Sequence, residues 1–141
     1  MPRIALAPRL VLAALTLLAL PTLAAEKAPA DVHLYMGWPN NGEVVRSPFK
    51  VWFGLRGMGV APKDVRAPDT GHHHLLIDTP LPPADEPIPS DRNHLHFGNG
   101  ETETMVELPP GKHTLQLMLG DYDHKPFDPP VVSKKITVTV K

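Results

Sequence analysis

Cysteine is absent from the 141 residues of the chain. This absence excludes disulfides, thiolate metal ligands, cysteine nucleophiles and the lipid-bearing cysteine of a bacterial lipoprotein. An excess of one charge is also absent, because 14 lysines and arginines stand against 15 acidic residues. A nucleic-acid-binding domain would carry a basic excess, so we expect no nucleic-acid partner. The chain does contain eight histidines, which are unusual for so short a sequence.

Residues 1–25 predict a secretory signal peptide. Arg3 and Arg9 provide its positive start, Leu10–Leu20 its apolar run, and small residues lead to a cleavage site after Ala25. An uncleaved membrane anchor is the alternative, but a helix of this apolar run spans about 16 Å of a bilayer core of about 30 Å. We therefore expect residues 26–141 to form one periplasmic or secreted domain, with no membrane span after signal cleavage.

The rest of the chain alternates apolar and polar residues and shows no helical period. Prolines, 18 in the whole chain, interrupt every stretch of useful helix length. Residues 79–93 are rich in proline and predict an extended loop within one domain. The alternation predicts strands over residues 32–36, 44–45, 49–56, 72–78, 94–97, 101–108, 112–119 and 131–140. These short strands favour an all-β, antiparallel β-sandwich of immunoglobulin-like type, with a small barrel as the alternative.

Two pairs of histidines occupy alternate positions of predicted strands. Residues two apart in a strand point to the same face, about 7 Å apart. His72 and His74 therefore form one pair, and His94 and His96 form another. If the two strands pair across the proline-rich loop, four imidazoles gather on one exterior sheet face. Imidazole binds copper, zinc, nickel and iron, so the spacing predicts a transition-metal site.

The strand predicted over residues 112–119 adds two further candidate ligands. It would lie on the other side of the 72–78 strand and bring Met118 to the same face, while His113 begins its apolar side. A thioether beside imidazoles favours copper, and Cu(II) has the highest affinity of the divalent first-row ions for nitrogen ligands. We therefore expect copper, with zinc as the second candidate and with His113 and Met118 as additional ligands.

The histidines also have structural explanations. Hydrogen bonds to Asp78, Asp91 or the backbone would account for paired imidazoles without a metal. His73 shares a face with apolar residues and is expected in the core. The acidic stretch Asp121–Asp128, which includes His124, lacks the pattern of a calcium-binding loop. We interpret that stretch as a solvated turn.

Signatures of common enzyme classes are missing. The sequence contains no Gly-x-Ser-x-Gly, no His-Glu-x-x-His and no glycine-rich phosphate loop, so we expect no enzymatic activity. One near-match is to the two metal motifs of cupin enzymes, in which His94, His96, Glu101 and His113 would be ligands. The second of these motifs is one residue short, and too little chain separates the two for the strands that a cupin requires.

Three segments resemble a known family. They are GHHHLLID (Gly71–Asp78), HLHFG (His94–Gly98) and LPPGKHTLQL (Leu108–Leu117). With the end of the chain they are similar to a family of small exported bacterial proteins of unknown function. The resemblance implies an exported single-domain β protein and carries no established chemistry. Gly71–Asp78 and Leu108–Val140 also bear a looser likeness to immunoglobulin-like periplasmic domains linked to copper handling.

These observations together favour reversible binding of a transition metal, for buffering or delivery. The predicted ligands are His72, His74, His94 and His96, and another cell-envelope protein is a candidate partner. The alternative is a non-enzymatic recognition module of the cell envelope that binds protein or glycan. In that alternative the histidines have structural roles, and Trp52 is one candidate contact residue.

Overall fold

The computed structural model describes residues 25–141, so the predicted signal peptide lies outside the described residues except for Ala25. Every regular element in this part of the chain is a β-strand, and no helix there is long and apolar enough to cross a membrane. The strands are β1 (His33–Trp38), β2 (Val44–Val45), β3 (Phe49–Arg56), β4 (Gly59–Val60), β5 (Thr70–Ile77), β6 (His94–His96), β7 (Glu103–Val106), β8 (Gly111–Gly120) and β9 (Ile136–Val140).

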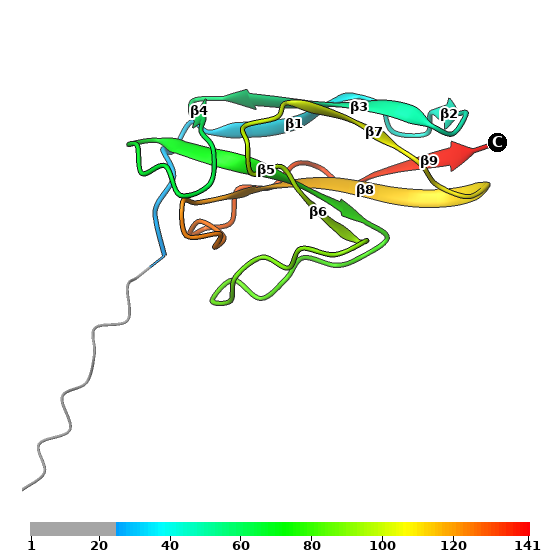
Figure 1. Ribbon diagram of the computed structural model, residues 1–141. Coiled ribbons are helices and arrows are strands. Elements are labelled where there is room, and N and C mark those ends of the chain that lie inside the picture. Colours follow the sequence, from blue (N-terminus) through cyan, green and yellow to red (C-terminus); the bar gives the residue numbers. More distant parts are fainter. Residues whose placement is uncertain (1–24) are drawn as a thin grey trace, which may run out of the picture.

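The strands form two layers, which lie one above the other in Figure 1. The smaller sheet has the order β1-β3-β7, and the larger has the order β2-β9-β8-β5-β4, with β6 also pairing to β5. The long pairings are antiparallel, whereas the short strands β2 and β4 pair in parallel with β9 and β5. The predicted β-sandwich is confirmed. Its immunoglobulin-like subtype stays a prediction, and β4 is too short to produce an alternation pattern.

The hydrophobic core lies between the two layers and is built by alternate residues of the long strands. Val51 of β3 and Leu117 of β8 are completely buried there, on the faces that the alternation predicts. Leu75 of β5 and Val138 of β9 are buried beside them. Because each of these strands contributes every second residue to the core, its remaining residues point to the outside of the sandwich.

His73 points into this core and is fully buried there. Its ring lies 5.1 Å from the ring of Phe53, and its Nδ1 lies 3.2 Å from the carbonyl oxygen of Glu101. The prediction that His73 belongs to the core is therefore confirmed. Since side chains alternate along β5, His72 and His74 lie on the outer side of the larger sheet.

The outer side of β5 is covered rather than exposed, which differs from the expected exterior face. The proline-rich loop, which hangs below β6 in Figure 1, brings Ile88 against Leu76 and Met118. The amide of Ile88 also donates to the carbonyl oxygen of His124 at 2.8 Å, which joins this loop to the turn after β8. Polar side chains on this side of β5 are consequently withdrawn from solvent.

Candidate metal centre

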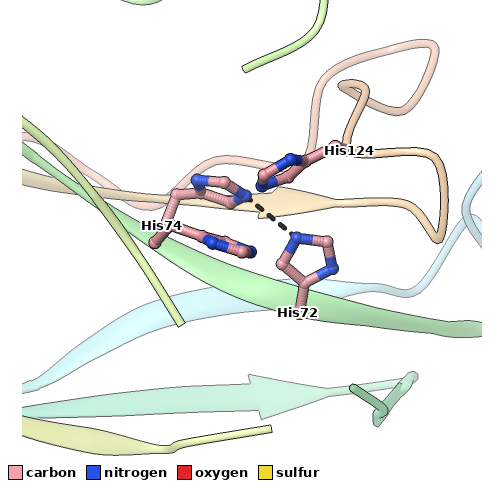
Figure 2. A group of neighbouring side chains, drawn as sticks. His72, His74 and His124 are labelled. Carbon is pink, nitrogen blue, oxygen red and sulfur yellow. Dashed lines mark hydrogen bonds between the residues drawn. The ribbon is translucent and has the colours of Figure 1, made fainter. Parts of the chain in front are cut away.

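Four histidines meet on the outer side of β5. His72, His74, His96 and His124 each offer one nitrogen, and these nitrogens all lie within 4.8 Å of one another. The ring centroids are 4.0–5.1 Å apart in every pair. Figure 2 shows that the rings of His72, His74 and His124 converge on one point from the strand and from the turn. Four rings spaced in this way can each direct one nitrogen to a common centre, as the four ligands of a tetrahedral zinc site do.

The β-ladder sets the positions of three members of this group. β6 runs antiparallel to β5 with His96 directly opposite His74, so both side chains lie on one face and their rings are 5.0 Å apart. His72 is the next residue of β5 on that face, and its Nε2 lies 3.1 Å from Nε2 of His74. The strands do pair across the proline-rich loop, which is the condition on which the predicted site depended, and the pairing brings His72, His74 and His96 together.

The fourth histidine comes from the turn after β8. Asp121 is buried there, and its Oδ1 accepts hydrogen bonds from the amides of Asp123 and Lys125 at 2.9 and 2.8 Å. The amide of His124 donates to the carbonyl oxygen of Asp121 at 3.0 Å. His124 has a φ of +68°, a left-handed conformation that is uncommon outside glycine. The Asp121 carboxylate thus holds a strained turn that directs His124 back over the sheet.

Two glycines leave the space in which the rings meet. Gly120 stands opposite His72 in the ladder, where a Cβ atom would lie 3.0 Å from Nε2 of His74 and 3.2 Å from Nε2 of His72. A Cβ atom on Gly98 would lie 2.7 Å from Nε2 of His96. Neither glycine has a positive φ, so the backbone does not require glycine at these positions. Glycine is required there because a Cβ atom would crowd the ring nitrogens.

Burial keeps the imidazoles of the group neutral at physiological pH. Desolvation, with repulsion between neighbouring imidazoles, lowers the pKa of His72 to about 4 and the pKa of His74 to about 2. Desolvation also lowers the pKa of His96 and the pKa of His124. Neutral imidazole is the form that binds metals, so these four side chains are already in the ligating state.

Several ring nitrogens of the group have no hydrogen-bond partner. Within residues 25–141, Nδ1 of His74, Nε2 of His96 and Nε2 of His124 are buried and unpartnered. The Nε2 atoms of His72 and His74 face each other. A buried polar atom without a partner costs about 1–3 kcal/mol. A metal ion at the centre of the group would give one nitrogen of each ring a partner.

His94, one of the four ligands predicted from spacing, lies outside this group. It shares the face of His96 but stands opposite Leu76, further along β5 from His72. Its Nδ1 lies 2.9 Å from Oδ1 of Asp91. The predicted face is therefore correct for His94, but the rings meet at the other end of the short β5–β6 ladder. For His94 the structure therefore agrees with the alternative explanation, a hydrogen bond to Asp91 without a metal.

His113 also lies apart, because it is on the wrong side of its strand. On β8 it lies two residues before the core residue Leu115, so both side chains are on the core side of the sheet. The group lies on the opposite side. Its Nδ1 lies 2.6 Å from Oδ2 of Asp78, and its Nε2 lies 2.9 Å from the carbonyl oxygen of Pro109. The ligand set that the cupin likeness predicts is not assembled for the same reason.

Met118 lies beside the histidine group. It stands opposite His74 in the ladder, so its side chain is on the face predicted for it. It is buried and packs against Leu76 and Ile88. A Cβ atom on Gly120 would also come within 3.2 Å of Ile88, which shows that this apolar cluster borders the space between the imidazoles. Met118 therefore forms part of the apolar wall next to the group.

His124 is the member of the group that sequence reasoning missed. The interpretation of its segment as a solvated turn is wrong for this residue, because Asp121 is buried and folds the turn toward the sheet. Alternation patterns carry no information on the direction of a turn. The one signal in the sequence is Gly120, which leaves an open position opposite His72 immediately before the turn.

Comparison with known protein families gives a match. The family model described as Domain of unknown function (DUF4399) matches residues 51–141. Neither the curated proteins nor the solved structures contain a match to the chain. The matched segment begins within β3 and contains all four histidines of the group. Because the match covers more than half of the sequence, the chain belongs to the DUF4399 family of unknown function.

Proposed function

We propose that His72, His74, His96 and His124 bind one transition-metal ion reversibly. The observation that carries the proposal is the near-equal spacing of the four rings, whose centroids lie 4.0–5.1 Å apart. Tetrahedral bonds of about 2.0–2.1 Å hold ligand nitrogens about 3.4 Å apart. The nitrogens of this group already lie within 4.8 Å, so small side-chain shifts bring them to bonding distance.

Burial of the group supports a ligand rather than a purely structural role. A structural cluster of imidazoles is stable when its ring nitrogens are hydrogen-bonded. Here His74, His96 and His124 each keep a buried nitrogen without a partner. Carboxylates bond to ring nitrogens of His94 and His113. Outside the group, the core residue His73 also keeps a buried nitrogen without a partner, but it stands alone there, whereas the three nitrogens of the group lie together. No such carboxylate bond is present for the four grouped residues within the described part of the chain.

Copper in its cuprous state is the ion that we propose, with zinc as its competitor. The tetrahedral arrangement of rings suits the d¹⁰ ions Cu(I) and Zn(II), whereas Cu(II) prefers a square or tetragonal arrangement. All four ligands are neutral, so a bound ion keeps its full charge inside a buried site. A single positive charge is less costly to desolvate than a double one, which favours Cu(I) over Zn(II).

The role that fits such a site is buffering or delivery of the metal, without enzymatic activity. Four protein ligands complete a tetrahedral shell, whereas catalytic zinc sites keep one position for water or substrate. The signal-like leader at residues 1–25 supports a periplasmic or secreted location. Glutathione and other cytosolic thiols do not compete for copper there, so imidazole ligands alone suffice for binding.

An anaerobic Cu(I) titration against a chromophoric chelator tests the proposal. The cluster variant is His96→Ala with His124→Ala, and the matched control is His94→Ala with His113→Ala. We expect one Cu(I) per chain in the wild type and the control. The cluster variant should lose more than about 100-fold in affinity, because outer-shell changes alone cost about 10–100-fold. Equal binding by both variants, or none by the wild type, would contradict the proposal.

A further inference from the structure

A groove runs along the free edge of β1, and its lining includes none of the four grouped histidines. It consists of two adjoining cavities of about 540 and 450 Å³, which share His33, Leu34 and Val132 in their linings. One wall is β1, the edge strand of the smaller sheet. The other wall is the segment before β9 that continues the larger sheet beside β8. The groove therefore lies between an edge of the smaller sheet and the segment that extends the larger one.

The hydrogen-bond directions of β3 fix those of β1. The amide of Phe53 donates to the carbonyl oxygen of Thr102 at 2.9 Å, on the side of β7. Main-chain groups alternate in direction along a strand, so those of the next residue, Gly54, point to β1. Gly54 is the register partner of Tyr35. The main-chain groups of Tyr35 consequently point back to β3.

The same alternation directs two residues of β1 toward the groove. Leu34 and Met36 flank Tyr35, so their amides and carbonyls point away from β3. Both residues line the groove. Their amides and carbonyls are thus the donors and acceptors that an edge strand presents to an incoming chain.

The opposite wall presents main-chain groups in the same way. The amide of Leu119 donates to the carbonyl oxygen of Val131, and the amide of Ser133 donates to that of Leu117, both at 2.9 Å. These bonds flank the bridge between β8 and Val132. The amide and carbonyl of Val132 itself therefore point away from β8, and Val132 lines both cavities.

We propose that this groove binds an extended peptide segment of a partner protein by strand addition. The segment would pair with Leu34 and Met36 along one edge and with Val132 along the other. Its inward side chains would be apolar, because the floor of the groove includes the buried Leu34. Lys27 and Lys134 outnumber the single Asp128 in the lining, so an acidic segment is favoured. This proposal does not depend on metal binding.

Proline substitutions test the two walls. Met36→Pro and Val132→Pro each remove an amide that points into the groove, and edge positions of this kind tolerate proline. Met105→Pro is the matched control. Met105 lies on β7, the opposite edge strand of the same sheet, and its amide points away from β3. Circular dichroism and thermal melting would establish that all three variants fold before binding is compared.

The probe is a display library of seven-residue peptides that alternate apolar residues with Thr, Ser, Asp or Lys. We expect enrichment of acidic members that bind the wild type and Met105→Pro. Met36→Pro and Val132→Pro should each bind about tenfold more weakly, the effect of one lost hydrogen bond. N-methylation of alternate amides on either edge of an enriched peptide should also weaken binding, because both edges are paired.

Three results of the binding and sedimentation experiments would overturn the proposal. One is enrichment that is equal for all variants, and another is the absence of any enriched peptide. The third is a dimer of the wild type in analytical ultracentrifugation that Met36→Pro dissociates, because a second copy would then be the occupant. Amide exchange locates the contact independently: slower exchange at Leu34 and Val132 in the complex is expected, and protection confined to other residues would contradict the proposal.

Discussion

Gly120→Ala probes the space in which the four imidazoles meet. The added Cβ atom would lie 3.0 Å from Nε2 of His74 and 3.2 Å from Nε2 of His72. Ordinary contacts are longer by a few tenths of an ångström, so both rings must move away from the strand. Overpacking of this kind costs about 1–3 kcal/mol of stability. Displacement of two ligand nitrogens should lower metal affinity by about 10–100-fold, as changes around the ligands of metal sites do.

Two measurements separate the effects of Gly120→Ala. Urea unfolding of the metal-free proteins gives the change in stability, and Cu(I) competition gives the change in affinity. Gly59→Ala is the control, because Gly59 also lacks a positive φ and its Cβ atom would meet the methyl group of Thr70 at 3.3 Å and the carbonyl oxygen of Asp69 at 3.9 Å, with no histidine nearby. The control should keep wild-type affinity. If Gly120→Ala kept it too, the ion would not lie between these two nitrogens, and the reasoning would be refuted.

Three further predictions concern pH and metal removal. The low pKa values of His72 and His74 mean that, below pH 6.5, the unfolded chain binds protons that the folded chain does not. Acid unfolding of the metal-free protein should therefore show a stability loss of about 2 kcal/mol per histidine between pH 8 and pH 5. The pKa of His113 is raised and the pKa of Asp78 is lowered. Their ion pair therefore stabilises the fold at pH values between the two pKa values, and this stabilisation is lost as pH rises through the pKa of His113. His113→Asn should accordingly cost about 1 kcal/mol more at pH 6 than at pH 9 in urea titrations. Saturating metal at 100 times its Kd should stabilise the protein by about 2.7 kcal/mol, and a chelator should reverse the rise in Tm.

The alternation of apolar residues predicted most of the fold because each long strand has one face in the core. Val51 and Leu117 are buried where that pattern places them. The pattern also identified the face of His72, His74 and His96. It could not identify the cover over that face, because packing of the proline-rich loop depends on contacts such as that of Ile88 with Met118 and Leu76, which no local pattern encodes.

The candidate site was predictable only where strands build it. Spacing identifies residues that share a face, so His96 was found, but it gives no position along the partner strand, so His94 was included as well. His113 was included although it shares a face of β8 with the core residues Leu115 and Leu117, on the side of the sheet opposite the group. His124 depends on a turn folded by the buried Asp121, and the direction of that turn is a tertiary property.

X-ray absorption of the copper-loaded protein tests the central claim most directly. Four grouped histidines predict a single shell of four nitrogen neighbours at about 2.0–2.1 Å, with the multiple-scattering pattern of imidazole. His124→Ala should reduce the shell to three nitrogens, and His94→Ala should leave it unchanged. A shell of two or fewer imidazoles in the wild type, or an unchanged spectrum in His124→Ala, would contradict the account.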